Sequence, residues 1–242
     1  MENTFIMKAD LDTSEAKLTH IKGLLEDIEE ISGRVFSKAG SRSHMEVINP
    51  ETSIDKLADA GVGQYVNIEL TDGRLARFDI VNRGYDWVRL DSHDCLGKSP
   101  WNESGSNEGG IAASDLHEYL CELYSLIPDD IKAHIPLVKR HMDKSEDDYY
   151  ETRIFVPDAS ELFGKDDDWY PDNYPQLHFY KDRRNRMKAS EPGGTEMCHW
   201  WTASAYSGNA ANAVLVNARG MSHSRSVTTA PIGVPVCFQY NL

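Results

Sequence analysis

Long apolar runs are missing from this 242-residue chain. No stretch approaches the ~18 consecutive apolar residues that a membrane-spanning helix needs, so we expect no membrane insertion. The first ten residues, Met1 to Asp10, also lack the basic and apolar segments of a secretory signal. We therefore expect a protein that is made in the cytoplasm and carries no signal peptide.

Basic residues are too few to balance the acidic ones. Lys and Arg number 25 against 39 Asp and Glu, which gives a net charge of −14. A surface this acidic repels nucleic-acid phosphates and anionic lipids, so we expect neither among the partners. The single basic cluster consists of Lys181, Arg183, Arg184, Arg186 and Lys188. We expect these side chains to pair with acidic neighbours at 166–168 or with Asp182.

Cysteine is scarce, and its spacing matches no metal-binding pattern. The four cysteines are Cys95, Cys121, Cys198 and Cys237, and no C-x-x-C pair occurs among them. We expect free thiols, most of them buried, and no structural zinc site.

Motifs of catalysis and cofactor binding are also missing. The sequence has no G-x-S-x-G, no H-E-x-x-H and no dinucleotide-binding glycine pattern. Gly97-Lys98-Ser99 resembles the end of a phosphate-binding loop, but Ser92 stands where the loop needs a glycine. The acidic run at 166–168 with Asp172 lacks the glycine and distal glutamate of a calcium loop. We expect no enzyme, no metal and no cofactor.

Apolar residues near the N-terminus recur at alternating spacings of three and four, which predicts a helix within residues 1–43. The a/d-type seam consists of Leu18, Ile21, Leu25, Ile28 and Val35. One interpretation is a short oligomerising coiled coil, because a Gly- and Ser-rich break follows at 33–43. The alternative is an amphipathic helix that packs on its own domain.

The apolar period changes to two after this break, which predicts strands. Residues 64–91 read as a three-stranded meander with an Asp72-Gly73 turn, followed by a loop over 97–110. Ser114 and Asp115 should open a helix, and a second helix is expected at 129–138. Residues 143–186 read as loop apart from one strand at 152–157. Further strands are expected at 198–203, 213–217, 222–228 and 234–240. The fold class is therefore α+β, in a domain spanning 45–242.

Four motifs occur in a distinctive order along this domain. They are S-D-L-H-E-Y-L at 114–120, F-V-P-D-A-S-E-L-F-G at 155–164, W-W-T-A-S at 200–204 and G-V-P-V-C-F at 233–238. Together they resemble a bacterial and phage domain family of unassigned function with a C-type-lectin-like fold, over residues 55–242. Thr202-Ala203 and Pro235-Val236 depart from that family's usual residues. The resemblance implies a C-type-lectin-like mixed domain with antiparallel strands, preceded by the N-terminal helix. Calcium-lectin signatures are missing, so calcium-dependent sugar binding is not expected.

The segment from Ala9 to Ala16 resembles the opening of phage tail proteins. The two resemblances imply a non-enzymatic phage or prophage protein of the virion, made in the bacterial cytoplasm. It would be a tail-tip or fibre component that is structural or recognises a host surface ligand. They also favour a homo-oligomer, a trimer over a dimer, in contact with other virion proteins. One alternative is an enzyme of the formylglycine-generating type, for which Cys198 and Cys237 are the candidate thiols. Another is a cytoplasmic interaction protein of a bacterial host.

In the fold that the resemblance implies, ligands bind near the final strands. The aromatic, amide and basic side chains of this region are Trp200, Trp201, Tyr206, Asn209, Asn212, Asn217, His223 and Arg225. Such side chains form adaptable recognition surfaces. Adjacent strand residues face opposite sides, however, so at least one of the two tryptophans is expected in the core.

Substituting both Ile21→Asp and Ile28→Asp should break the oligomer and leave the C-terminal domain folded, because each change places a charge in the apolar seam. Light scattering of the wild type and the double variant measures the effect. A monomeric wild type, or a variant that unfolds throughout, would mean that the helix packs on its own domain.

Overall fold

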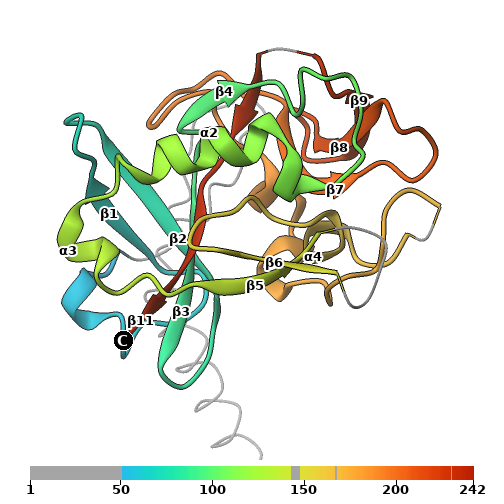
Figure 1. Ribbon diagram of the computed structural model, residues 1–242. Coiled ribbons are helices and arrows are strands. Elements are labelled where there is room, and N and C mark those ends of the chain that lie inside the picture. Colours follow the sequence, from blue (N-terminus) through green and yellow to red (C-terminus); the bar gives the residue numbers. More distant parts are fainter. Residues whose placement is uncertain (1–50, 143–147, 167, 230) are drawn as a thin grey trace, which may run out of the picture. The chain divides into compact units, whose positions relative to one another are not determined.

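The computed structural model describes residues 51–142, 148–166, 168–229 and 231–242 (Figure 1). The expected helix within 1–43, with its seam from Leu18 to Val35, lies outside these residues. The described chain is a mixed α+β fold with mostly antiparallel sheets, as the sequence predicts. None of its described helices is long and apolar enough to span a bilayer.

The first sheet contains the predicted meander, in the strand order β1-β2-β3-β11. Its strands are β1 (Tyr65–Glu69), β2 (Leu75–Arg83), β3 (Trp87–Ser92) and β11 (Cys237–Asn241). The predicted turn after β1 is confirmed, because Gly73 has a φ of +85° and its N–H donates to the Leu70 carbonyl. β2 runs from the turn as far as Arg83.

The second sheet has the order β4-β10-β7-β8-β9. Its strands are β4 (Gly97–Ser99), β10 (Ile232–Val234), β7 (Trp200–Ala205), β8 (Asn212–Val216) and β9 (Ser222–Ser226). A separate hairpin joins β5 (Val138–His141) to β6 (Tyr149–Thr152). The expected strands at 198–203, 213–217 and 222–228 correspond to β7, β8 and β9.

Short helices connect these strands. Ser114 caps α2 (Asp115–Tyr124) by accepting from the His117 N–H, as its sequence position predicts. The other helices are α3 (Asp129–Lys132), α4 (Ala159–Phe163) and the 3₁₀ turns η1 (Ile54–Lys56), η2 (Ile111–Ala113), η3 (His178–Lys181) and η4 (Arg183–Arg186). Helix α3 ends early, and Val138 already belongs to β5.

Several element predictions were wrong. The expected strand at 234–240 is broken at Pro235, which carries no N–H for a sheet ladder. Its halves, β10 and β11, belong to different sheets, and Figure 1 shows this C-terminal segment passing from one sheet to the other. β11 is an edge strand of the first sheet. The expected loop at 97–110 begins with β4. The expected strand at 152–157 does not form: Thr152 is the last residue of β6, and Phe155 makes only an isolated bridge with Cys237.

Both faces of the first sheet are covered. One face points Phe78, Val88, Leu90 and Phe238 into the main hydrophobic core, where the apolar side of α2 also packs. The other face carries Arg89 and Asp91 on β3, and these charged side chains are buried as well. A strand that is buried on both sides usually reads as continuously apolar. The charges on the second face therefore need partners from elements that lie over it.

Phe238→Ala should lower the free energy of unfolding by about 3–5 kcal/mol, because the fully buried ring packs 5.3 Å from the ring of Phe78. Leu242→Ala, beside the same strand with a side chain 40% exposed, should cost less than about 0.5 kcal/mol. Urea unfolding curves compare the two variants. Equal losses would contradict the placement of β11 against the core.

Candidate functional site

A row of polar side chains crosses the charged face of the first sheet. In the strand register, Arg89 of β3 lies opposite Asn82 of β2 on one side and Gln239 of β11 on the other. Partners in register point to the same face of a sheet, and so does Trp87, two residues before Arg89. These four side chains form one side of a cleft of about 220 Å³, which we call the central cleft.

The opposite side of the central cleft comes from segments that are distant in the sequence. β5 supplies Val138, Lys139 and Arg140, and α4 supplies Glu161. Irregular chain supplies the remaining lining residues, which are Phe155, Tyr174, Pro175 and Leu177.

Arg89 is the buried cation at the base of the cleft. Its guanidinium binds both carboxylate oxygens of Asp91, at 2.8 and 3.0 Å, in the bidentate geometry that favours strong ion pairing. A third N–H group donates to the Glu161 carboxylate. The Tyr180 hydroxyl donates to Asp91 at 2.6 Å, which holds this carboxylate from the other side.

Glu161 joins two arginines and caps a helix at the same time. Its two oxygens accept from the Arg140 guanidinium at 3.0 and 2.8 Å, in addition to the bond from Arg89. The same carboxylate accepts from the backbone N–H of Asp158 at 2.9 Å, which completes a capping box at the start of α4. The Asp158 side chain in turn accepts from the Ser160 N–H.

Aromatic rings fix the position of Arg140. Its guanidinium carbon lies 4.3 Å from the centre of the Phe155 ring and 4.2 Å from that of Tyr174. Arg89 also faces the Phe155 ring, at 4.9 Å. Tyr174 is held by its backbone N–H, which donates to Ser160, and by its hydroxyl, which accepts from the His141 N–H. Aromatic rings therefore lie against both guanidinium groups at the base of the cleft.

Electrostatic interactions within the cluster keep Glu161 and Arg89 ionised. Burial alone would raise the pKa of Glu161, but Arg140 and Arg89 outweigh it and lower the pKa to about 2. Burial lowers the pKa of Arg89 less than the charges of Asp91 and Glu161 raise it, so the guanidinium stays protonated. Burial and the Glu161 charge raise the pKa of Asp158. Near neutral pH, Glu161 is an ionised anchor and has no proton to donate as a general acid.

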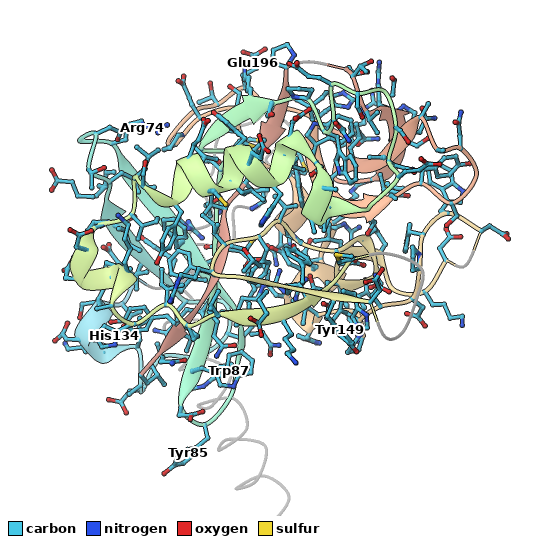
Figure 2. The ribbon with its side chains drawn as sticks, in the orientation of Figure 1. Arg74, Tyr85, Trp87, His134, Tyr149 and Glu196 are labelled. Carbon is cyan, nitrogen blue, oxygen red and sulfur yellow. The ribbon has the colours of Figure 1, made fainter. Side chains whose placement is uncertain are left out.

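The rim of the cleft is more open than its base. Trp87 is half-buried there, and its indole ring occupies space that only a glycine leaves free at position 84: a Cβ at Gly84 would lie 2.6 Å from Cε2 of the ring. Figure 2 shows neighbouring Tyr85, which is fully exposed, pointing away from the body at the tip of the β2–β3 hairpin. Lys139 is exposed at the opposite rim.

The two tryptophans expected in a binding face are core residues. Trp200 and Trp201 are both 0% exposed, and they belong to different hydrophobic clusters because they point to opposite faces of β7. Each indole N–H donates to a backbone carbonyl, that of Arg186 for Trp200 and that of Ser99 for Trp201. The expectation that they contact a ligand is therefore corrected.

Asn217 accepts from the Arg219 and Met221 N–H groups in the β8–β9 turn, and the other expected ligand-binding residues fall into two groups outside the central cleft. The Asn107 side chain donates to the carbonyls of Tyr206, Asn209 and Asn212. These hydrogen bonds fix residues 206–212 to the loop that precedes α2. His223 and Arg225 are exposed on β9. Burial, followed by electrostatic interaction with Arg225 and His223, lowers the pKa of His199.

The basic cluster has the structural role that the sequence predicts, in part with different partners. Arg184 forms the expected ion pair with Asp182, at 2.5 Å. Arg186 and Lys188 are buried instead and donate to backbone carbonyls, Arg186 to Leu162 and Lys188 to Ser92. Within the described residues, no three His, Cys, Asp or Glu side chains are grouped to hold a metal ion.

Sequence reasoning missed every residue of the central cleft. One signal was present, since Asp158 and Glu161 stand at capping-box spacing before an apolar pair. This spacing identifies Glu161 as a cap. Its arginine partners are 72 and 21 positions away in the sequence, so no local pattern marks them.

The pKa of Glu161 falls from 4.5 to about 2 in the folded protein, so its ionisation adds about 3 kcal/mol to stability above pH ~4.5. This contribution should disappear as the pH falls from about 4.5 to 2. Asp158 acts in the opposite sense, because its raised pKa favours the folded protein on acidification. Glu161→Gln should remove the Glu161 part of the acid dependence. At neutral pH it should cost roughly 3–5 kcal/mol, since two buried guanidinium groups lose their shared partner.

Urea unfolding between pH 2 and 7 measures both effects. Asp72→Asn is the matched control, because Asp72 pairs with Arg74 at 2.8 Å on the surface. The control should cost less than about 1 kcal/mol. A Glu161→Gln protein with the acid dependence of the wild type would refute this account of the cluster.

Comparison with known proteins places the lining of the central cleft, apart from Asn82, within a family domain. The family model described as a domain of unknown function, DUF6273, matches residues 85–241, which include β3, β5, α4 and β11. No curated protein and no solved structure was found to match the chain. Since the match covers more than half of the sequence, the chain belongs to the DUF6273 family.

Proposed function

We propose that this protein is a non-enzymatic binding protein and that its ligand occupies the central cleft. The observation that carries the proposal is the row of Asn82, Arg89 and Gln239 beside Trp87, set over a base of buried ion pairs. Amide and aromatic side chains at an open rim make directional hydrogen bonds and stacking contacts. The buried ion pairs at the base of the cleft hold these side chains at fixed positions.

The charge arrangement favours binding over catalysis. General acid–base catalysis needs a group whose pKa lies near the working pH. Glu161 instead has a pKa of about 2, and its oxygens are occupied by two arginines and a backbone N–H. Asp91 is likewise occupied by Arg89 and Tyr180. The carboxylates near the cleft therefore serve as anchors for the arginines.

The ligand we propose is a carbohydrate, with one sugar unit inside the cleft. At about 220 Å³, the cleft is smaller than the ~300–1,000 Å³ of sites for drug-sized ligands, so a single ring fills it. Amides donate to and accept from hydroxyl groups, and the Trp87 face stacks on apolar C–H groups. The recognition uses no calcium, in keeping with the missing calcium-lectin signatures.

The biological setting we propose is a phage or prophage particle, in which the domain recognises a host surface ligand or acts as a structural part of the tail. The sequence resemblance supports this setting and a C-type-lectin-like fold. The antiparallel pairing of the C-terminal β11 with β3 of the early meander is compatible with such a fold. The homo-oligomer rests on the seam from Leu18 to Val35, outside the described residues. The preference for a trimer and the contacts with other virion proteins rest on the resemblance to phage proteins.

The alternative enzyme of the formylglycine-generating type receives less support. Its candidate thiols were Cys198 and Cys237. Cys237 is fully buried next to Asp91, and Cys198 lies against Cys95. The other alternative is a cytoplasmic interaction protein of a bacterial host. Identification of the proteins that bind this chain would distinguish it from a phage protein.

A glycan array of bacterial surface sugars tests the proposal on the full chain, followed by calorimetric titration of the sugar that binds best. Trp87→Ala should weaken binding at least tenfold, about 1.4 kcal/mol, because the stacking face is lost. Gly84→Ala should weaken it as well, since the new Cβ displaces the Trp87 ring without removing it. A calcium chelator should change nothing.

Two controls separate the cleft from general effects on the fold. Gly61→Ala is the matched glycine control, because the nearest atom to its Cβ would be 3.8 Å away. Tyr85→Ala removes an exposed aromatic residue next to Trp87 but outside the cleft lining. Both should bind like the wild type. Array binding that survives both cleft substitutions, or a wild type that retains no glycan, would overturn the proposal.

A further inference from the structure

Two cysteines that are far apart in the sequence meet between the sheets. Cys95 lies in the connection between β3 and β4, and Cys198 lies just before β7, 103 positions later. Their sulfur atoms are 3.6 Å apart, within hydrogen-bonding reach for thiols. Both are free cysteines. A disulfide bond of about 2.05 Å would require the sulfurs to approach by roughly 1.5 Å.

The backbone around the pair is fixed by one short segment. The Cys95 N–H donates to the Ala189 carbonyl and the Cys198 N–H donates to the Lys188 carbonyl, each at 3.0 Å. Asp94 strengthens the same junction, because its carboxylate accepts from the Ala189 and Gly193 N–H groups. The two cysteines are therefore held beside each other by adjacent residues of a common segment.

Gly233 provides the space that the sulfurs occupy. A Cβ at this position of β10 would lie 2.6 Å from the Cys95 sulfur and 2.8 Å from the Cys198 sulfur. Its backbone N–H donates to the His199 carbonyl, so β10 is fixed next to the pair. Any larger residue would have to push the sulfurs aside.

The two thiols differ in access and in acidity. Cys95 is fully buried, and burial raises the pKa of its thiol well above the ordinary value. Cys198 is partly exposed. The hydrogen bond from Cys95, opposed by burial and aided by Lys98 and Lys188, lowers the pKa of Cys198. Cys198 thus combines solvent access with a lowered thiol pKa, two features that favour reaction with an oxidant.

We propose that Cys198 and Cys95 are the attacking and resolving thiols of a redox-reactive pair, which a low-molecular-weight disulfide such as oxidised glutathione converts into an internal disulfide. The juxtaposed sulfurs, the access to only one of them and the space at Gly233 carry this inference. It is independent of the carbohydrate-binding proposal.

The reaction balances in two exchange steps. The Cys198 thiolate attacks one sulfur of oxidised glutathione, forms a mixed disulfide and releases one glutathione thiolate. The Cys95 sulfur then attacks the sulfur of Cys198, which breaks the mixed disulfide and releases the second glutathione. The two cysteine protons leave on the two glutathione molecules. The protein is oxidised by two electrons and glutathione disulfide is reduced by two.

Exposure of the folded full-length chain to oxidised glutathione tests the proposal. Thiol blocking, non-reducing protease digestion and mass spectrometry should identify a Cys95–Cys198 peptide and a mass loss of two hydrogens. The oxidised protein should unfold several degrees higher, because the bond closes a long loop. Cys95→Ser should stop the reaction at Cys198 carrying one glutathione, and Cys198→Ser should prevent it.

Cys121→Ser and Cys237→Ser are the cysteine controls, and both should leave the linked peptide unchanged. Cys121 is exposed on α2 and Cys237 is buried in β11. The digest of the wild type decides the matter even where a variant fails to fold. Four free thiols after treatment, or a linked peptide that contains Cys121 or Cys237 instead, would overturn the proposal.

Discussion

The carboxylate of Glu161 is the contact on which the arrangement of the site depends. It is almost fully buried, and it binds Arg89 of β3, Arg140 of β5 and the first turn of α4. A buried ion pair adds little net stability, because desolvation offsets much of the attraction, whereas loss of one partner leaves an uncompensated charge. The cluster therefore acts chiefly as a constraint: β5 and α4 must lie over the charged face of the first sheet.

This constraint explains how an antiparallel sheet is buried on both faces. The core face of β3 follows the ordinary rule, with Val88 and Leu90 packed among apolar residues. The other face carries Arg89 and Asp91, whose charges are satisfied by Glu161 and Tyr180 from the covering segments. Phe155 and Tyr174 then fill the space around the guanidinium groups. The result is a polar interface inside the domain, with the central cleft at its open edge.

The sequence predicts features that depend on neighbouring residues. Alternating apolar residues located β1 to β3, Asp72-Gly73 located their turn, and Ser114 located the start of α2. Prediction failed where the structure depends on contacts between residues that are distant in the sequence. Pro235 divides the final apolar run, but its sequence does not reveal that the halves enter different sheets. Trp200 and Trp201 suited a binding surface by residue type, and packing on both sides of β7 made both of them core. The cleft escaped prediction because its arginines and glutamate meet only through the fold.

Two glycines show how the same fold makes room for chemistry at separate places. Gly84 leaves space for the indole ring of Trp87 at the rim of the cleft, and Gly233 leaves space for the sulfurs of Cys95 and Cys198. Neither position has the positive φ that usually calls for glycine, so backbone conformation does not account for either of them. In both cases the missing side chain determines where a neighbouring group lies. The fixed ion pairs hold the base of the cleft, and these small open volumes set the positions of the groups with which a ligand or an oxidant would react.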